Sequence, residues 1–162
     1  MEYELTRSRD HRRLYDIEGV GTLGFDGFLG RRAIARAGAT DWSFDRGGFW
    51  RTTINAFDAG GAVVGSFDPR ALRRGGSLRW GDRDLALQPA SAWKERYALV
   101  EQGVELAVLD DKSWGKRPLK ITVNEPGLVE PGLMLFAAFA VRQLADDASA
   151  TAGGAAAVAA TG

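Results

Sequence analysis

Three segments of the chain, residues 70–80, 93–97 and 114–117, interleave basic and aromatic side chains. Indole rings beside Lys and Arg suit the headgroup region of a membrane, and they also suit single-stranded nucleic acid. Alternate residues of a strand face opposite ways, so a Trp in such a segment can equally be core beside a solvated Lys. With that alternative open, the candidate anion or lipid surface consists of Arg73, Arg74, Trp93, Lys94, Arg96, Trp114, Lys116 and Arg117.

A single histidine limits the catalysis that the chain can support. His11 lies among arginines in a charged N-terminal segment, where we expect it to be solvated. One such residue cannot build a serine triad or a histidine-rich metal site. The nucleophile elbow Gly-x-Ser-x-Gly is also missing from the sequence. We therefore expect no enzyme activity and assign no catalytic residue.

Paired carboxylates could act as acid and base or hold a divalent cation, and such pairs occur at residues 82 and 84, 110 and 111, and 146 and 147. Each pair lies beside an expected turn or at an expected helix end, where solvated Asp is ordinary. Asp110 and Asp111, followed by Lys112, look like a polar hairpin tip. We expect no metal site and no cofactor.

The glycine-rich segment 19–24 matches the dinucleotide fingerprint by letter. That motif needs a helix N-terminus directly after it, so that backbone N–H groups meet a pyrophosphate. The following residues, 25–30, include two glycines and cannot open a stable helix. We interpret the segment as a turn or strand in a crowded barrel wall.

Composition bounds the class of protein. The 162 residues carry 21 Lys and Arg against 21 Asp and Glu, so no net charge draws the chain to nucleic acid, which we expect not to be a partner. No cysteine is present, and the charged N-terminus cannot serve as a signal peptide, which favours a reducing, cytoplasmic location. An attachment at the periphery of a membrane remains open.

Short β-prone runs, separated by Gly, Asp and Pro, fill most of the chain and predict an all-β barrel or sandwich. Residues 97–109 form a hairpin around Gln102 and Gly103, since glycine there can take positive φ. Residues 119–123 alternate apolar and polar side chains, as a half-buried strand does. The predicted strands are 33–36, 41–45, 50–57, 62–67, 77–80, 84–87, 96–101, 104–109 and 119–123.

One helix is expected, at residues 131–147. Pro131 suits the first helical position, and the Leu, Met and Ala that follow are strong helix formers. Its first turns are apolar on every side, so we expect protein all around it. The apolar run 132–141 is about half of the roughly 20 residues that span a membrane, so it is not a span. Residues 148–162 contain almost only Ala, Gly, Ser and Thr, and we expect a mobile tail or a frayed helix.

Many short strands followed by a helix that is apolar all round suggest a closed barrel with the helix as its filling. The order of segments 77–81, 97–99, 104–107, 119–123 and 133–136 resembles the tubby-like superfamily, and more narrowly its LURP-one-related and phospholipid-scramblase-like branch, especially small bacterial members. The resemblance covers residues 42–145. It implies a twelve-stranded antiparallel barrel around a C-terminal helix, here one domain over residues 1–147.

What this resemblance implies about function is a non-catalytic module. Tubby domains bind phosphoinositides through surface basic residues, whereas scramblases are associated with membranes and calcium. Scrambling is not expected of this chain, which has no cysteine to palmitoylate and no acidic loop with calcium-ligand spacing. We expect a peripheral binder of anionic lipid or a protein-interaction module. The alternative is a small-ligand carrier or an enzyme with a barrel cavity, which requires the helix to lie outside the barrel.

Overall fold

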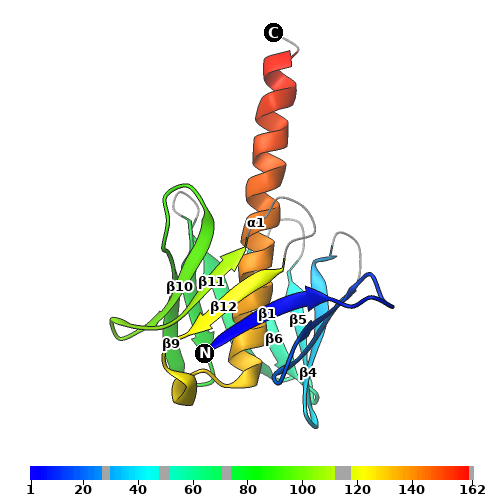
Figure 1. The fold of residues 1–162 in the computed structure, drawn as a ribbon, viewed down its shortest axis with the longest axis vertical. Coiled ribbons are helices and arrows are strands. Elements are labelled where there is room, and N and C mark those ends of the chain that lie inside the picture. Colours follow the sequence, from blue (N-terminus) through cyan, green and yellow to red (C-terminus); the bar gives the residue numbers. More distant parts are fainter. Residues whose placement is uncertain (27–29, 48–51, 71–73, 112–117, 161–162) are drawn as a thin grey trace.

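Twelve antiparallel strands close into a barrel around one helix, the architecture that the sequence predicts (Figure 1). In this computed structural model the described residues are 1–26, 30–47, 52–70, 74–111 and 118–160, with side chains of the helix described as far as Thr151. The elements are β1 (Glu2–Arg7), β2 (Leu14–Ile17), β3 (Gly21–Asp26), β4 (Arg32–Ala37), β5 (Thr40–Arg46), β6 (Ile54–Asp58), β7 (Val63–Pro69), β8 (Gly76–Trp80), β9 (Arg83–Pro89), β10 (Glu95–Glu101), β11 (Val104–Asp111), β12 (Leu119–Val123), the 3-10 turn η2 (Pro126–Leu128) and α1 (Pro131–Ala160).

The sheet is a simple meander in which each strand pairs with the next one along the chain. It closes because β1 pairs with both β2 and β12, where Leu5 lies opposite Ile17 on one side and Leu119 on the other. Successive residues of a strand point to opposite faces, so one face of each strand can line the interior. In β12 the burial alternates residue by residue, with Lys120 and Thr122 outside, as predicted.

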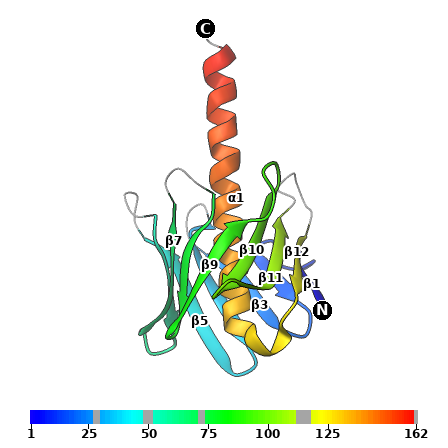
Figure 2. The same cartoon turned by 90° about the vertical axis from the view of Figure 1, so that its left-hand side faces the viewer.

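The helix α1 fills the interior of the barrel (Figure 2). It begins at Pro131, as predicted, and every residue from Gly132 to Val141 is buried. Leu133, Phe136 and Phe139 are 0% exposed, and the two phenylalanine rings lie 5.1 and 5.6 Å from the ring of Phe44. A helix without a polar face is stable here because strands surround it. The helix therefore occupies the space in which a barrel carrier would hold its ligand.

The first three strands are the part of the fold that the sequence pattern did not reveal. Each has a single fully buried apolar residue: Leu5, Ile17 and Leu23 are at most 1% exposed. The glycine-rich segment lies in the turn before β3 and in β3 itself, with no helix after it in the described residues, so the interpretation as turn and strand is confirmed. One predicted strand, residues 50–57, is shorter than expected at its start. It is β6, which begins at Ile54; residues 50 and 51 are outside the described part.

The predicted hairpin at residues 97–109 is confirmed as β10, a two-residue turn and β11. Gln102 and Gly103 both adopt positive φ, 48° and 80°. Such a turn has the backbone twist of the strands that it joins. The register places Glu101 opposite Val104, and after a shift of one residue between Val100 and Leu99 it places Arg96 opposite Asp110.

The end of the barrel at which α1 begins is closed by the connection from β12, residues 124–130. Arg83 fastens this connection, because its guanidinium donates to the carbonyl of Leu128 at 2.9 Å and pairs with Glu101 at 2.7 Å. The Trp80 indole N–H donates to Glu130 just before the helix. We call this the closed end of the barrel.

At the opposite end α1 leaves the barrel and continues beyond the strands to Ala160 (Figure 1). Exposure changes at this point: Ala145 is 2% exposed, whereas residues 146–151 are all exposed. We call this the exit end. Among the described residues, no helix combines the length and the apolar character needed to cross a membrane.

Candidate anion-binding surface

The connections at the two ends of the barrel carry opposite charges although the chain as a whole is neutral. Because strands alternate in direction, connections between an odd strand and the following even strand lie at the exit end, and the others at the closed end. The closed-end connections contain no Lys or Arg and four acidic residues: Glu18, Asp82, Glu125 and Glu130. The described residues of the exit-end connections contain one acidic residue, Asp10, and seven basic ones: Arg9, Arg12, Arg13, Arg31, Arg70, Arg74 and Lys94.

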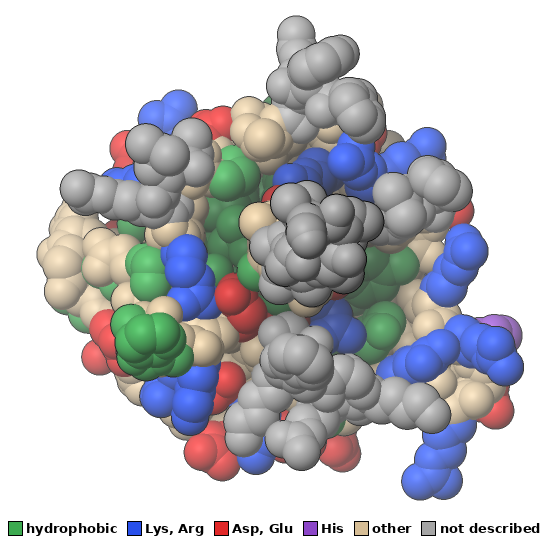
Figure 3. Space-filling model, turned by 90° about the horizontal axis from the view of Figure 1, so that it is seen from above, with side chains coloured by type: hydrophobic (Ala, Val, Ile, Leu, Met, Phe, Trp, Pro, Cys, Tyr) green, Lys and Arg blue, Asp and Glu red, His purple; other side chains and the backbone are tan. Residues whose placement is uncertain are grey.

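Most of these exit-end cations are unpaired. Of the seven, only Arg74 forms an ion pair with a described carboxylate. Five are exposed, and Arg31 is half-buried: the exposed ones are Arg9, Arg12, Arg13, Arg70 and Lys94. Viewed along the barrel axis, Lys and Arg side chains lie around the helix, together with some acidic side chains and with apolar side chains visible between them (Figure 3). Solvated charges of one sign, gathered at one end, produce a local field that a net charge of zero conceals.

Among the described residues, the connection between β9 and β10 presents the most exposed aromatic side chain of this end. Trp93 is 95% exposed, and its neighbours Lys94 and Arg96 are exposed as well. An indole on a loop beside two cations has an apolar body and a polar N–H, which suits the boundary between headgroups and acyl chains. These three of the predicted site residues therefore form one solvent-facing group.

Arg74 holds this group in place from a different loop. Its guanidinium donates to the carbonyls of Ser91 at 3.1 Å and Lys94 at 2.6 Å, and to the carboxylate of Glu95 at 2.7 Å. It also lies 5.5 Å from the ring centre of Tyr97. Arg74 was predicted as part of the binding surface. Its guanidinium instead forms hydrogen bonds and an ion pair that position the loop carrying Trp93.

A buried tyrosine supports the same arrangement. The Tyr97 hydroxyl donates to Glu95 at 2.8 Å, so Glu95 is held by Tyr97 and Arg74 together. Burial raises the pKa of Tyr97 to about 12, and the nearby Glu95 carboxylate adds to the effect. Tyr97 therefore stays a neutral hydrogen-bond donor across the physiological range.

The four remaining predicted residues, Arg73, Trp114, Lys116 and Arg117, lie outside the described residues. Trp80, which follows the first basic segment, is 6% exposed and belongs to the core. For Trp80 the structural interpretation of the pattern is therefore the right one. His11 is exposed, as expected.

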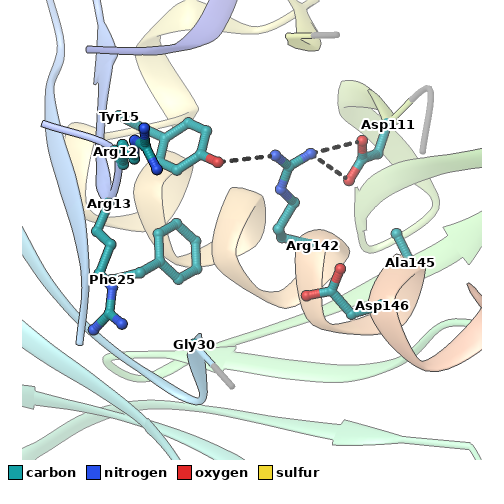
Figure 4. Close-up of a pocket in the computed structure, with 9 residues that line it drawn as sticks. All are labelled: Arg12, Arg13, Tyr15, Phe25, Gly30, Asp111, Arg142, Ala145 and Asp146. Atoms are coloured by element: carbon teal, nitrogen blue, oxygen red, sulfur yellow. Dashed lines mark hydrogen bonds and ion pairs between the residues drawn. The ribbon is translucent and has the colours of Figure 1, made fainter. Parts of the chain in front are cut away.

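Asp110 and Asp111 are not a polar hairpin tip, and here the prediction was wrong. Both belong to β11, and the Asp111 side chain is fully buried. It pairs with Arg142 of α1 at 3.1 Å, and Arg142 also donates to the Tyr15 hydroxyl at 3.4 Å (Figure 4). Burial raises the pKa of Asp111 because the loss of water outweighs the attraction of Arg142. The signal in the sequence is the single Arg142 that interrupts the apolar helix.

Further polar contacts tie α1 to the exit end of the barrel. Arg46 of β5 pairs with Asp147 at 2.6 Å, and the Gln143 amide donates to the carbonyl of Gly30 at 3.0 Å. The helix thus changes from apolar packing to ion pairs and hydrogen bonds as it approaches solvent. In the described part of the chain, no group of His, Cys, Asp and Glu is arranged to hold a metal ion.

Comparisons with known proteins return no relative. No family model, no curated protein and no solved structure matches the chain.

Proposed function

We propose that this protein is a binding module of the tubby-like, LURP-one-related type, with no catalytic role, that attaches through the exit end of its barrel to anionic membrane surfaces. The observation that carries the proposal is the separation of charge between the connections of the two ends: besides the paired Arg74, the exit-end connections contain six basic residues that pair with no described carboxylate, against one acidic residue. Each Lys or Arg near an anionic leaflet contributes about 1 kcal/mol of binding. The chain fits this architecture as twelve strands around a buried helix.

Trp93 favours a lipid partner over other anionic partners. Trp93 is 95% exposed beside the exposed Lys94, and tryptophan is enriched where headgroups meet acyl chains. Arg74 fixes the backbone of this loop through the carbonyls of Ser91 and Lys94, so the backbone that carries the indole needs little further ordering. A partly ordered anchor loses less entropy on binding.

The protruding part of α1 has to be accommodated in such a contact. Residues 148–160 contain no charged side chain, so they add no repulsion to an anionic surface. The glycine pair Gly153–Gly154 is a position at which a helix can bend. A contact of the exit-end loops therefore requires this segment to tilt aside or to enter the headgroup layer.

Co-sedimentation with vesicles tests the proposal. Vesicles of phosphatidylcholine alone and with added phosphatidylserine are compared at low and high salt, and we expect binding to the anionic vesicles that weakens as salt rises. Lys94→Gln should reduce affinity about fivefold, the equivalent of one cation near the leaflet. Trp93→Ala should reduce binding at both salt concentrations, because the apolar contact of the indole is not screened.

Two matched variants serve as controls. Lys120→Gln removes an exposed cation of the barrel wall, and Leu128→Ala removes a 47% exposed apolar side chain at the closed end. Neither should change vesicle binding. Absence of binding to anionic vesicles at low salt, or equal losses from the controls, would refute the proposal.

A further inference from the structure

A hollow of about 270 Å³ lies at the exit end between the start of β2, the end of β3 and the last enclosed turn of α1. Its lining includes two aromatic side chains, Tyr15 and Phe25, and three arginines, Arg12, Arg13 and Arg142 (Figure 4). This volume is below the range typical for drug-sized ligands, about 300–1,000 Å³. It suits a ligand with roughly one ring.

One wall of the hollow is already fixed. Arg142 pairs with the fully buried Asp111 and lies 5.3 Å from the ring centre of Tyr15. Tyr15 in turn meets Phe25 edge to face, with ring centres 5.4 Å apart. The charge of Arg142 is balanced by Asp111, so this wall is preformed and aromatic.

Two arginines at the rim of the hollow have no described carboxylate as a partner. Arg12 and Arg13 are both exposed and pair with no described carboxylate. Their backbone is nevertheless held: the Arg7 guanidinium donates to the Arg12 carbonyl at 2.9 Å, and the Phe25 N–H donates to the Arg13 carbonyl at 2.8 Å. Two guanidinium groups are thus anchored at their base and free at their tips. Guanidinium groups bind carboxylate and phosphate through paired hydrogen bonds.

We propose that the hollow binds a small organic oxyanion, a carboxylate or phosphate on a flat apolar group, with Arg13 holding the charged head and Phe25 and Tyr15 contacting the body. This site goes beyond attachment to a membrane, since its ligand is a single molecule recognised by shape. It uses none of the Trp93 loop.

Asp146 tunes the site. It lines the hollow one helical turn after Arg142, and its negative charge opposes an incoming anion. Partial removal of water raises the pKa of Asp146 above its ordinary value. The charged groups that act on it are Arg142, Asp111, Asp147 and Arg46. Removal of the Asp146 charge should therefore strengthen anion binding.

Titration calorimetry with three soluble probes, phenyl phosphate, benzoate and inorganic phosphate, tests this site without vesicles. We expect phenyl phosphate or benzoate to bind with Kd of about 1 mM or tighter, and inorganic phosphate to bind more weakly because it lacks the apolar body. Arg13→Gln should weaken binding about tenfold, the loss of one charged hydrogen-bonding group. Asp146→Asn should tighten it.

Controls separate this site from the membrane surface. Arg36→Gln removes an exposed arginine of the barrel wall and should leave the affinity for phenyl phosphate unchanged. Trp93→Ala should also leave it unchanged while it weakens vesicle binding. If phosphate is recognised only as part of a lipid, Arg13→Gln will lower vesicle binding and no soluble probe will bind, which overturns the proposal of a soluble ligand but leaves the membrane proposal standing.

A result in which phenyl phosphate binds, but equally well to wild type and to Arg13→Gln with unchanged circular dichroism, would also overturn the assignment of the hollow. Conversely, binding of phenyl phosphate that depends on Arg13, together with no binding to anionic vesicles, would support the hollow and refute the membrane surface.

Discussion

The closed end and the exit end of the barrel are built from the same twelve strands but differ in turn length and charge. Four of the five hairpin turns at the closed end have two or three residues, and all the charged residues in the connections of that end are acidic. The exit-end connections are five to seven residues long and mostly basic. Tight turns serve the fold, whereas longer loops carry side chains that need not pack. The closed end therefore has the short turns that the meander requires, and the exit end has the longer loops at which we propose that binding takes place.

The largest expected effect concerns packing near the closed end. Phe136 is 0% exposed and its ring lies 5.6 Å from that of Trp80. Phe136→Asp buries a charge without a partner and should destabilise the protein by about 4 kcal/mol or more, enough to unfold it. Ala148→Asp places the same charge on the exposed part of the same helix and should leave the melting temperature nearly unchanged. A Phe136→Asp variant that melts like wild type would show that the helix is not enclosed.

Loss of the ion pair between Arg142 and Asp111, where α1 approaches the exit end, should have the next largest effect on stability. Arg142→Met leaves Asp111 buried without its partner and should cost about 3 kcal/mol in urea unfolding. The pKa of Asp111, already raised by burial, then rises further. The folded state binds this proton more tightly than the unfolded state, so the loss should shrink as pH falls through that pKa.

A double variant sharpens this measurement. Arg142→Met combined with Asp111→Leu removes both charges and should be more stable than Arg142→Met alone, since apolar replacements of a buried pair are often neutral. If the double variant is no better than the single one, Asp111 is not the group left unpaired.

A smaller loss is expected from a glycine at the closed end. A Cβ atom on Gly132 would lie 2.7 Å from Trp80 Cζ2 and 2.8 Å from Trp42 Cζ2. Both atoms belong to rigid rings, so Gly132→Ala should destabilise the protein by about 2 kcal/mol in thermal unfolding. Gly127→Ala is the matched control, because a Cβ there meets no atom within 4 Å. Equal melting temperatures of the two variants would contradict the close contact of the helix with the tryptophans.

The smallest effect is expected beyond the exit end. Side chains 146–151 of α1 are exposed, and the residues that follow carry no large side chain except Val158. A chain that ends at Thr151 should therefore unfold within about 0.5 kcal/mol of the full chain. A loss of several kcal/mol would place part of the stability in this segment.

Local pattern alone determined much of the barrel, because strand alternation and turn residues are properties of neighbouring positions. The hairpin at Gln102 and Gly103, the alternation of residues 119–123 and the enclosed helix were all predictable in this way. The strands β1 to β3 were not predictable, because a single buried residue in each, such as Leu5 or Ile17, makes no alternating pattern. These residues become buried only when the barrel closes. Of the candidate surface, the loop with Trp93 could be predicted, but the role of Arg74 could not.

What only the tertiary structure decided is which distant residues share an end of the barrel. The sequence determined a neutral chain with scattered basic residues, and composition cannot show that antiparallel closure brings basic loops together at one end and acidic turns at the other. It also could not show that Asp111 meets Arg142, 31 residues away, because the partner of a buried charge is chosen by the three-dimensional path of the chain. Charge patterns and ion pairs depend on distances in space, and these exist only once the helix lies inside the closed sheet.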